Sequence, residues 1–104
     1  MYVRTKKGEI FDCYESEQMH EPIYYPKKSK SNGYIDYEDV YKKSDNLIDI
    51  LQVGDYVNGY IVKDILDNGP NGLVVQTAID FLYERDIKSI VTKEMFEQME
   101  YKIE

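Results

Sequence analysis

Few residues of this chain are able to do chemistry, because it holds one cysteine, Cys13, and one histidine, His20. A cysteine nucleophile needs a base within hydrogen-bond reach, and His20 follows Cys13 by only seven residues, so a contact between them is conceivable. Nothing in the sequence indicates an oxyanion hole or a third, orienting group. We interpret Cys13 as a partly buried thiol and His20 as a surface imidazole, and we predict no catalytic residue and no enzyme.

Metal and phosphate sites are not indicated either. A zinc ion takes about four ligands, and Cys13 and His20 are the only soft ones available. The run 67–72 lacks the alternating ligands and closing glutamate of an EF-hand, so we interpret it as a turn. No glycine-rich loop opens a long helix, and the sequence predicts no cofactor and no metal. Two carboxylate pairs are interpreted as solvated faces rather than acid–base groups: Asp36 with Glu38, and Asp80 with Glu84.

The most unusual segment holds three tyrosines and three carboxylates within eight residues, from Tyr34 to Tyr41. If it is a strand, neither of its faces is purely apolar, which is unusual for a core strand. Tyrosine is favoured at interfaces, and carboxylates between the rings suit an Arg/Lys-rich partner groove of the kind that normally holds nucleic acid. Ordinary packing in a small β-domain is the alternative. The predicted partner-binding residues are Tyr34, Asp36, Tyr37, Glu38, Asp39 and Tyr41.

Length and charge place these residues in a small acidic domain. A chain of 104 residues with a net charge of −7 predicts one β-rich domain, 1–104, with a thin core. Residues 1–33 carry a net charge of +1 and residues 34–104 carry −8. No apolar run reaches the length of a membrane span or a signal peptide, and a single cysteine forms no internal disulfide. We therefore expect a cytoplasmic location.

The residue inventory favours strands over helices. The chain holds 11 Ile, 8 Val and 11 Tyr against 5 Leu and a single Ala, and β-branched and aromatic residues suit strands. The predicted fold is mainly β, a β-rich α+β class: a strongly bent antiparallel sheet or small barrel of six to seven short strands with two short helices. Strands are predicted at 2–5, 10–14, 20–25, 34–42, 56–66, 73–77 and 83–91, with an optional edge strand at 101–103.

Turns and helices separate these strands. Gly8 is predicted to turn with a positive φ, and Gly59 to mark a bulge. Residues 27–33 are predicted to form a mobile hairpin loop, because Lys-rich polar sequence ends there in Asn-Gly. Pro22 and Pro26 confine the third strand to an edge. Short helices are predicted at 46–51, capped by Asp45, and from Thr92 to Gln98, although one helix across 36–51 also fits the periodicity.

Two segments are similar to sequences found in small proteins encoded by phages and prophages of low-GC Gram-positive bacteria. The first is Asn46–Tyr60 and the second is Ile87–Lys102. Together they cover about a third of the chain. The resemblance implies a phage or prophage setting, and thus that the expected cytoplasm is that of an infected bacterial host. It implies no activity and no functional residue.

These observations lead to a binding function. We expect a phage-encoded acidic protein that inhibits a host protein, and the favoured target is a nucleic-acid-handling antiviral defence effector, as for anti-CRISPR inhibitors. One alternative is a nucleic-acid-binding accessory protein, although the net charge opposes it. It rests on two basic groups: Lys27, Lys28 and Lys30 beside Tyr24 and Tyr25, and Arg4, Lys6 and Lys7. A virion assembly or structural component is another alternative. A homodimer through an exposed edge strand is also possible.

Overall fold

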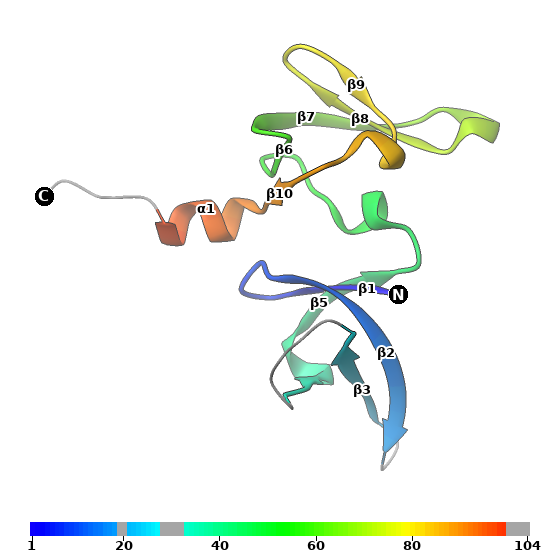
Figure 1. Cartoon of the computed structure of the whole chain (residues 1–104), viewed down its shortest axis with the longest axis vertical. Coiled ribbons are helices and arrows are strands. Elements are labelled where there is room, and N and C mark those ends of the chain that lie inside the picture. Colours follow the sequence, from blue (N-terminus) through cyan, green and yellow to red (C-terminus); the bar gives the residue numbers. More distant parts are fainter. Residues whose placement is uncertain (19–20, 28–32, 100–104) are drawn as a thin grey trace, which may run out of the picture. The chain divides into compact units, whose positions relative to one another are not determined.

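The computed structural model describes residues 1–18, 21–27 and 33–99. The chain forms two compact units, Met1–Ile50 and Leu51–Glu104, each built on its own five-stranded antiparallel sheet (Figure 1). The predicted mainly β fold is confirmed. The prediction of a barrel is wrong, because neither sheet closes, and six to seven strands is too few, since ten lie in the described ranges.

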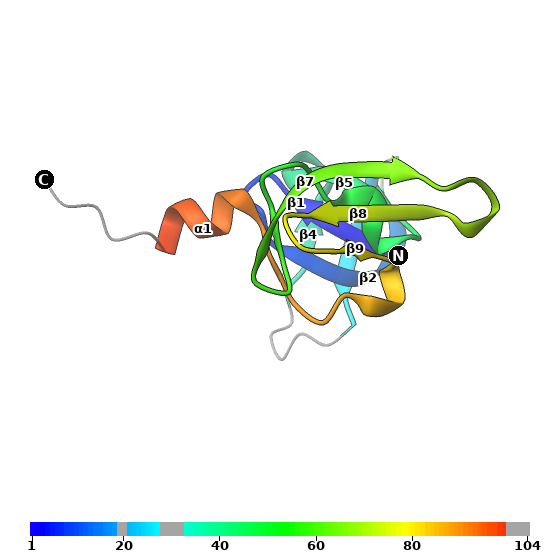
Figure 2. The same cartoon turned by 90° about the horizontal axis from the view of Figure 1, so that it is seen from above.

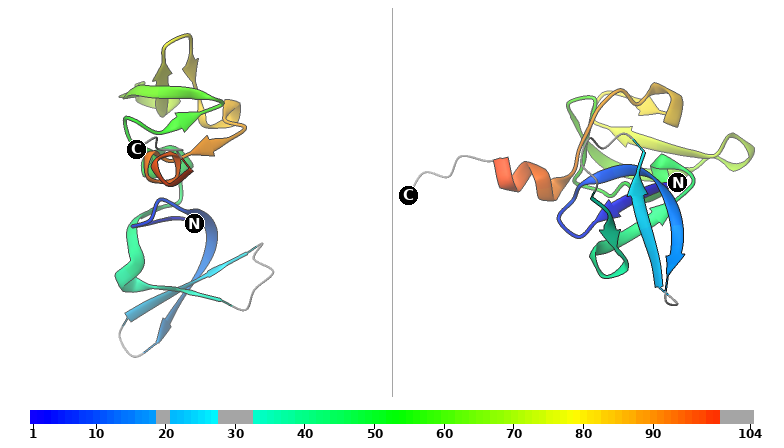
Figure 3. Two further views of the ribbon diagram at one scale, coloured as in Figure 1. Left: turned by 90° about the vertical axis from the view of Figure 1, so that its left-hand side faces the viewer. Right: turned by 60° about the horizontal axis from the view of Figure 1, so that its bottom comes forward.

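The first unit is a meander whose fifth strand returns to pair with the first. Its strands are β1 (Tyr2–Thr5), β2 (Ile10–Gln18), β3 (Glu21–Pro26), β4 (Ile35–Asp36) and β5 (Val40–Ser44). They are ordered β4-β3-β2-β1-β5 in the sheet, and the long β2–β3 pair is strongly twisted (Figure 3). A 3-10 turn, η1 (Tyr37–Asp39), links β4 to β5, and a second, η2 (Leu47–Ile50), follows β5.

The core of the first unit comes from the inner faces of β1 to β4. Val3, Cys13, Tyr24 and Ile35 are buried together, and three partly buried residues pack against them: Met1, Phe11 and Val40. Gly8 turns the β1–β2 hairpin with a φ of 90°, which confirms its predicted role.

Strand β3 lies inside the sheet, so its predicted edge position is wrong. Strand β4 pairs only with Ile23 and Tyr24, and Lys27 donates its N–H to β2. Because N–H groups alternate in direction along an antiparallel strand, the N–H groups that the two prolines lack would point toward β4. Strand β4 is only two residues long and does not pair with either proline, so no ladder hydrogen bond is lost there. Pro22 and Pro26 are therefore tolerated without an edge position.

The predicted long strand 34–42 is broken by η1, and no helix spans 36–51, so both predictions for this segment are wrong. Extending one strand through it would bring tyrosines and carboxylates to the inner face, whereas with the 3-10 turn only Ile35 and Val40 of this segment point inward. The predicted helix at 46–51 is the 3-10 turn η2. Just before this turn, the Ser44 Oγ accepts the Asn46 N–H at 3.1 Å. The cap by Asp45 stays a prediction.

The second unit holds β6 (Tyr56–Val57), β7 (Tyr60–Asp67), β8 (Leu73–Thr77), β9 (Phe81–Leu82), β10 (Ile90–Val91) and α1 (Lys93–Met99). Strands β7, β8 and β9 lie side by side (Figure 2). The predicted strand at 73–77 and the turn before it are confirmed, the latter containing η3 (Gly69–Asn71). Thr92 caps α1 as predicted, since its Oγ1 accepts the Met95 N–H at 3.3 Å.

Two strand predictions fail in the second unit. The expected bulge at Gly59 is a two-residue hairpin turn, because Val57 pairs with Tyr60 and Asn58 and Gly59 have φ of 52° and 87°. The predicted strand 83–91 is instead η4 (Glu84–Asp86) followed by β10. The Tyr83 N–H donates to the Asp86 carboxylate at 3.1 Å, which stabilises this turn.

The two units share one topology. The order β10-β6-β7-β8-β9 repeats β5-β1-β2-β3-β4. In each unit a three-residue 3-10 turn separates the fourth strand from the fifth, and a hydroxyl at or just after the end of the fifth strand accepts a backbone N–H two or three residues further on, Ser44 from Asn46 and Thr92 from Met95. In each unit an inward apolar cross-strand pair precedes the turn: Tyr24 with Ile35, and Val75 with Leu82. The fold therefore contains an internal repeat.

Several expectations concern the chain as a whole. The strand predicted at 10–14 is longer in the structure, where β2 continues to Gln18. Most of the predicted loop 27–33 and the optional strand 101–103 fall outside the described residues. No helix among the described residues is long and apolar enough to cross a membrane. The single domain 1–104 stays a prediction, since it concerns whether the two units unfold together.

Candidate partner-binding surface

The six predicted partner-binding residues are all exposed. Tyr34 is 57% exposed, and Tyr37 and Tyr41 are each 55% exposed. The three carboxylates Asp36, Glu38 and Asp39 are exposed as well. The segment therefore directs its tyrosines and acids to solvent, and only two of its residues turn inward: Ile35 is buried and Val40 is half-buried.

The 3-10 turn explains this exposure. The Val40 N–H closes the turn by donating to the Tyr37 carbonyl, and Asp36 stands at its N-cap in extended conformation. Asp36 makes no side-chain capping hydrogen bond, so its carboxylate is not used to hold the turn. The backbone carbonyl of Asp39 accepts the Lys6 N–H at 2.9 Å, which ties the turn to the β1–β2 hairpin.

Two hollows flank η1. Tyr37, Glu38 and Tyr41 line a groove of about 600 Å³ together with Tyr24, Val40 and three lysines: Lys6, Lys42 and Lys43. Tyr34 and Asp39 line a cavity of about 370 Å³ with residues of the β1–β2 hairpin and Pro26. The first unit holds eight basic and ten acidic residues, a net charge of −2. The groove beside Tyr37 thus mixes basic and acidic side chains.

A row of three tyrosines crosses the outer face of the first sheet. Tyr14 on β2 pairs directly with Tyr25 on β3, and the Tyr25 and Tyr34 rings lie 6.2 Å apart at 51°. Tyr14 is 63% exposed. The structure therefore joins Tyr34 to Tyr25, which the sequence had singled out only for the nucleic-acid alternative, and to Tyr14, which it had not singled out.

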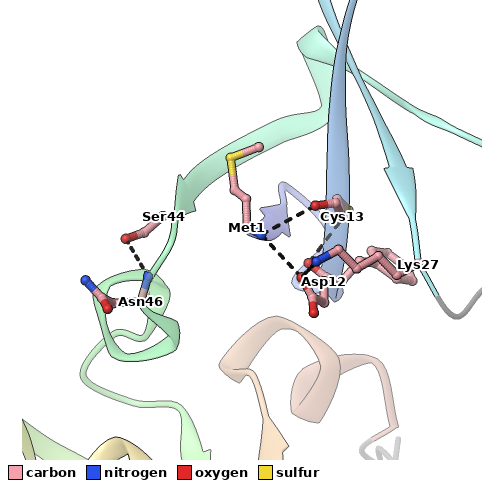
Figure 4. Close-up of polar contacts among 7 residues, drawn as sticks. Met1, Asp12, Cys13, Lys27, Ser44 and Asn46 are labelled. Carbon is pink, nitrogen blue, oxygen red and sulfur yellow. Dashed lines mark hydrogen bonds and ion pairs between the residues drawn. The ribbon is translucent and has the colours of Figure 1, made fainter.

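A lysine lies over one end of this row. The Lys27 Nζ is 4.9 Å from the centre of the Tyr14 ring and 3.4 Å from Oδ1 of Asp12, and Figure 4 shows Lys27 reaching Asp12. Asp12 also accepts a hydrogen bond from the α-amino group of Met1 at 3.3 Å. Burial alone would raise the pKa of Asp12, but the hydrogen bond from Met1 and the Lys27 charge outweigh it, so the pKa lies below its ordinary value.

A second lysine occupies a similar setting between β2, β3 and β5. The Lys43 Nζ lies 2.7 Å from Oε1 of Glu15 and 5.3 Å from the centre of the Tyr24 ring. Glu15 and Tyr24 are themselves a cross-strand pair. The hydrogen bond from Lys43 lowers the pKa of Glu15, and the same bond together with one to Tyr24 raises the pKa of Lys43.

The cysteine belongs to the core. Cys13 is 2% exposed, and burial, reinforced by the charge of Asp12, raises the pKa of its thiol, which disfavours the thiolate that a nucleophile requires. His20 lies outside the described residues, as do Lys28 and Lys30. No group of three potential metal ligands occurs within the described part of the chain.

In the second unit, polar side chains hold together the two segments that carry the sequence resemblance. The Asp55 carboxylate accepts the Gln52 N–H at 2.7 Å and the Lys93 N–H at 2.9 Å, and Asp55 is fully buried. The Asn58 side chain accepts N–H groups from Lys88 and Ser89 at 2.7 and 3.1 Å. These hydrogen bonds thus join two segments that lie far apart in the sequence.

The sequence indicates which side chains share a face with the tyrosines of this row, although the row itself depends on the pairing of the strands. Asp12 and Tyr14, and likewise Tyr34 and Asp36, are two residues apart, so each pair lies on one face of its strand.

Comparison with protein-family models, with curated proteins and with solved structures finds no match for this chain.

Proposed function

We propose that this chain is a non-enzymatic binding protein, encoded by a phage or prophage, that inhibits a host protein. The favoured target is a nucleic-acid-handling effector of antiviral defence. The contact surface is the acidic tyrosine segment, consisting of Tyr34, Asp36, Tyr37, Glu38, Asp39 and Tyr41. One observation carries the proposal: all six side chains of this segment are exposed.

Physical reasons support a protein partner. Three large tyrosine rings more than half exposed on a unit of 50 residues offer rigid contact area that costs little side-chain entropy to immobilise. Carboxylates between the rings attract a basic surface and speed its encounter with the chain. The mixed charge of the groove beside Tyr37 favours specific ion pairs with a protein over general mimicry of a nucleic acid backbone.

The proposal is tested by capture from a bacterium that carries a nuclease-based defence system. The tagged full chain is compared with a double variant, Tyr37→Ser with Glu38→Gln. A matched control, Phe81→Ser with Glu97→Gln, removes an equally exposed ring and one charge from the second unit. We expect the wild-type chain and the control to recover the effector and restore phage growth, and the double variant to lose both. No enriched protein together with unchanged phage growth would contradict the proposal.

A second candidate, binding to single-stranded nucleic acid, is favoured by the row Tyr14, Tyr25 and Tyr34 with Lys27 at its end. Bases stack on such rings, and the affinity of this binding falls steeply with salt. Fluorescence anisotropy with a labelled oligonucleotide at two salt concentrations tests it. Salt-sensitive binding that is lost in Tyr14→Leu would favour this candidate over the first.

A further inference from the structure

The first unit uses one arrangement to hold a cation on its outer face. On β2, Asp12 and Tyr14 are two residues apart and flank the buried Cys13. Lys27 lies between them, with its Nζ 3.4 Å from the carboxylate and 4.9 Å from the ring centre. The ring face and the carboxylate both attract positive charge, so together they position the lysine head group.

The same arrangement recurs at the edge of the sheet. Tyr34 and Asp36 flank the buried Ile35, and the strand rise places the two residues about 6–7 Å apart on one face. Tyr25 lies beside Tyr34 with its ring centre 6.2 Å away. Among residues 1–18, 21–27 and 33–99, no lysine or arginine pairs with Asp36 or lies over Tyr34.

We infer that Tyr34 and Asp36 form a binding site for an arginine side chain supplied by the protein partner. This inference rests on the proposed function and names the chemistry that its surface recognises. The guanidinium group stacks on the Tyr34 ring while its edge donates hydrogen bonds to the Asp36 carboxylate. Arginine fits better than lysine, because a planar group with several donors satisfies an aromatic face and a carboxylate at once.

The position of the pair supports an external ligand. Strand β4 is at the edge of the sheet, so Tyr34 and Asp36 have no neighbouring strand on their outer side. Tyr34 is 57% exposed, and the Asp36 carboxylate makes no capping bond that would have to break. Within the described residues, an incoming arginine therefore breaks no ion pair of Asp36, whereas the equivalent pair Asp12 and Tyr14 is already occupied by Lys27.

The experiment is an NMR titration of the full chain with three blocked amino acids: N-acetyl-arginine methylamide and its lysine and citrulline counterparts. We expect amide signals of residues 34–36 to shift saturably with arginine in the millimolar range, more weakly with lysine, and not with the uncharged citrulline. Tyr34→Leu and Asp36→Asn are each expected to weaken arginine binding about tenfold. The control Asp64→Asn removes an exposed carboxylate of the second unit and is expected to change nothing.

The outcomes separate this inference from the function it rests on. No saturable shift at residues 34–36, or equal shifts with arginine and citrulline, would overturn the arginine site even if the capture experiment recovers a partner through Tyr37 and Glu38. Arginine binding at Tyr34 and Asp36 in a chain that captures no host protein would uphold the site and reject the proposed function.

Discussion

The buried carboxylate of Asp55 offers a direct test of how the second unit is held together. It accepts two backbone hydrogen bonds, from Gln52 at 2.7 Å and from Lys93 at 2.9 Å. The first bond closes the turn before β6 and the second fixes the first residue of α1. Replacing Asp55 with alanine leaves two partly buried N–H groups without this acceptor, at a cost of about 1–3 kcal/mol each. Relief from burying a charge offsets part of that cost.

We therefore expect Asp55→Ala to lower the free energy of unfolding by about 2–4 kcal/mol, a large fraction of the total for a small protein. With an m-value of about 2 kcal/mol/M, the urea midpoint falls by about 1–2 M. Circular dichroism follows the transition, and hydrogen exchange is expected to show lost protection at the amides of Gln52 and Lys93. Asp55→Asn keeps one accepting oxygen and is expected to lose less.

The control for this experiment is Asp64→Asn, whose exposed carboxylate accepts only the N–H of the next residue, Ile65, at 2.8 Å. It is expected to change stability by less than about 0.5 kcal/mol. An Asp55→Ala protein within about 0.5 kcal/mol of wild type, with protected amides at Gln52 and Lys93, would refute the role assigned to the carboxylate.

Three further expectations concern the titrating groups and the two units. The hydrogen bond from Lys43 lowers the pKa of Glu15, so the stability that this pair contributes is present above the ordinary glutamate pKa and is lost as pH falls through the lowered value. Lys43→Met is therefore expected to flatten the acid side of a stability–pH curve from urea melts, and an unchanged curve would count against the pair. The raised pKa of Cys13 predicts slow alkylation by iodoacetamide in the folded protein, and a rate matching that of the urea-unfolded chain would show that the thiol is accessible. The one-domain prediction expects residues 1–50 and 51–104 to unfold in a single transition when amide signals of both units are followed by NMR, and two separate transitions would contradict it.

Composition predicted the class of the fold, because the preference of Ile, Val and Tyr for strands does not depend on any particular long-range contact. Local turn chemistry also carried over at Gly8 and Thr92, where one residue determines the conformation. The Asn58-Gly59 turn was equally visible in the sequence as a hairpin signal. It was missed because the apolar residues on either side resemble one long strand.

The internal repeat was beyond the reach of the sequence. The two units share strand order, but their inward pairs differ in residue type, Tyr24 with Ile35 in one and Val75 with Leu82 in the other. Pairing of the fifth strand with the first depends on contacts across a whole unit, and β10, with only two residues, shows no alternation of its own.

The candidate surface was predicted as a segment, and the structure shows how its residues divide. Sequence alone placed Tyr37 and Tyr41 on one face of a strand, whereas the 3-10 turn places them on a groove and leaves Tyr34 beside Tyr25. Tyr14 joins that row through β2–β3 pairing. Such neighbours follow from register, which the sequence does not specify without the connecting turns.

The central claim, that the acidic tyrosine segment binds a host protein, is tested most directly by measuring affinity for the captured effector by calorimetry. The account predicts that Tyr37→Ser with Glu38→Gln weakens binding at least tenfold, while Phe81→Ser with Glu97→Gln binds as tightly as wild type. Equal affinity of the two double variants, or a loss confined to the second-unit control, would contradict it.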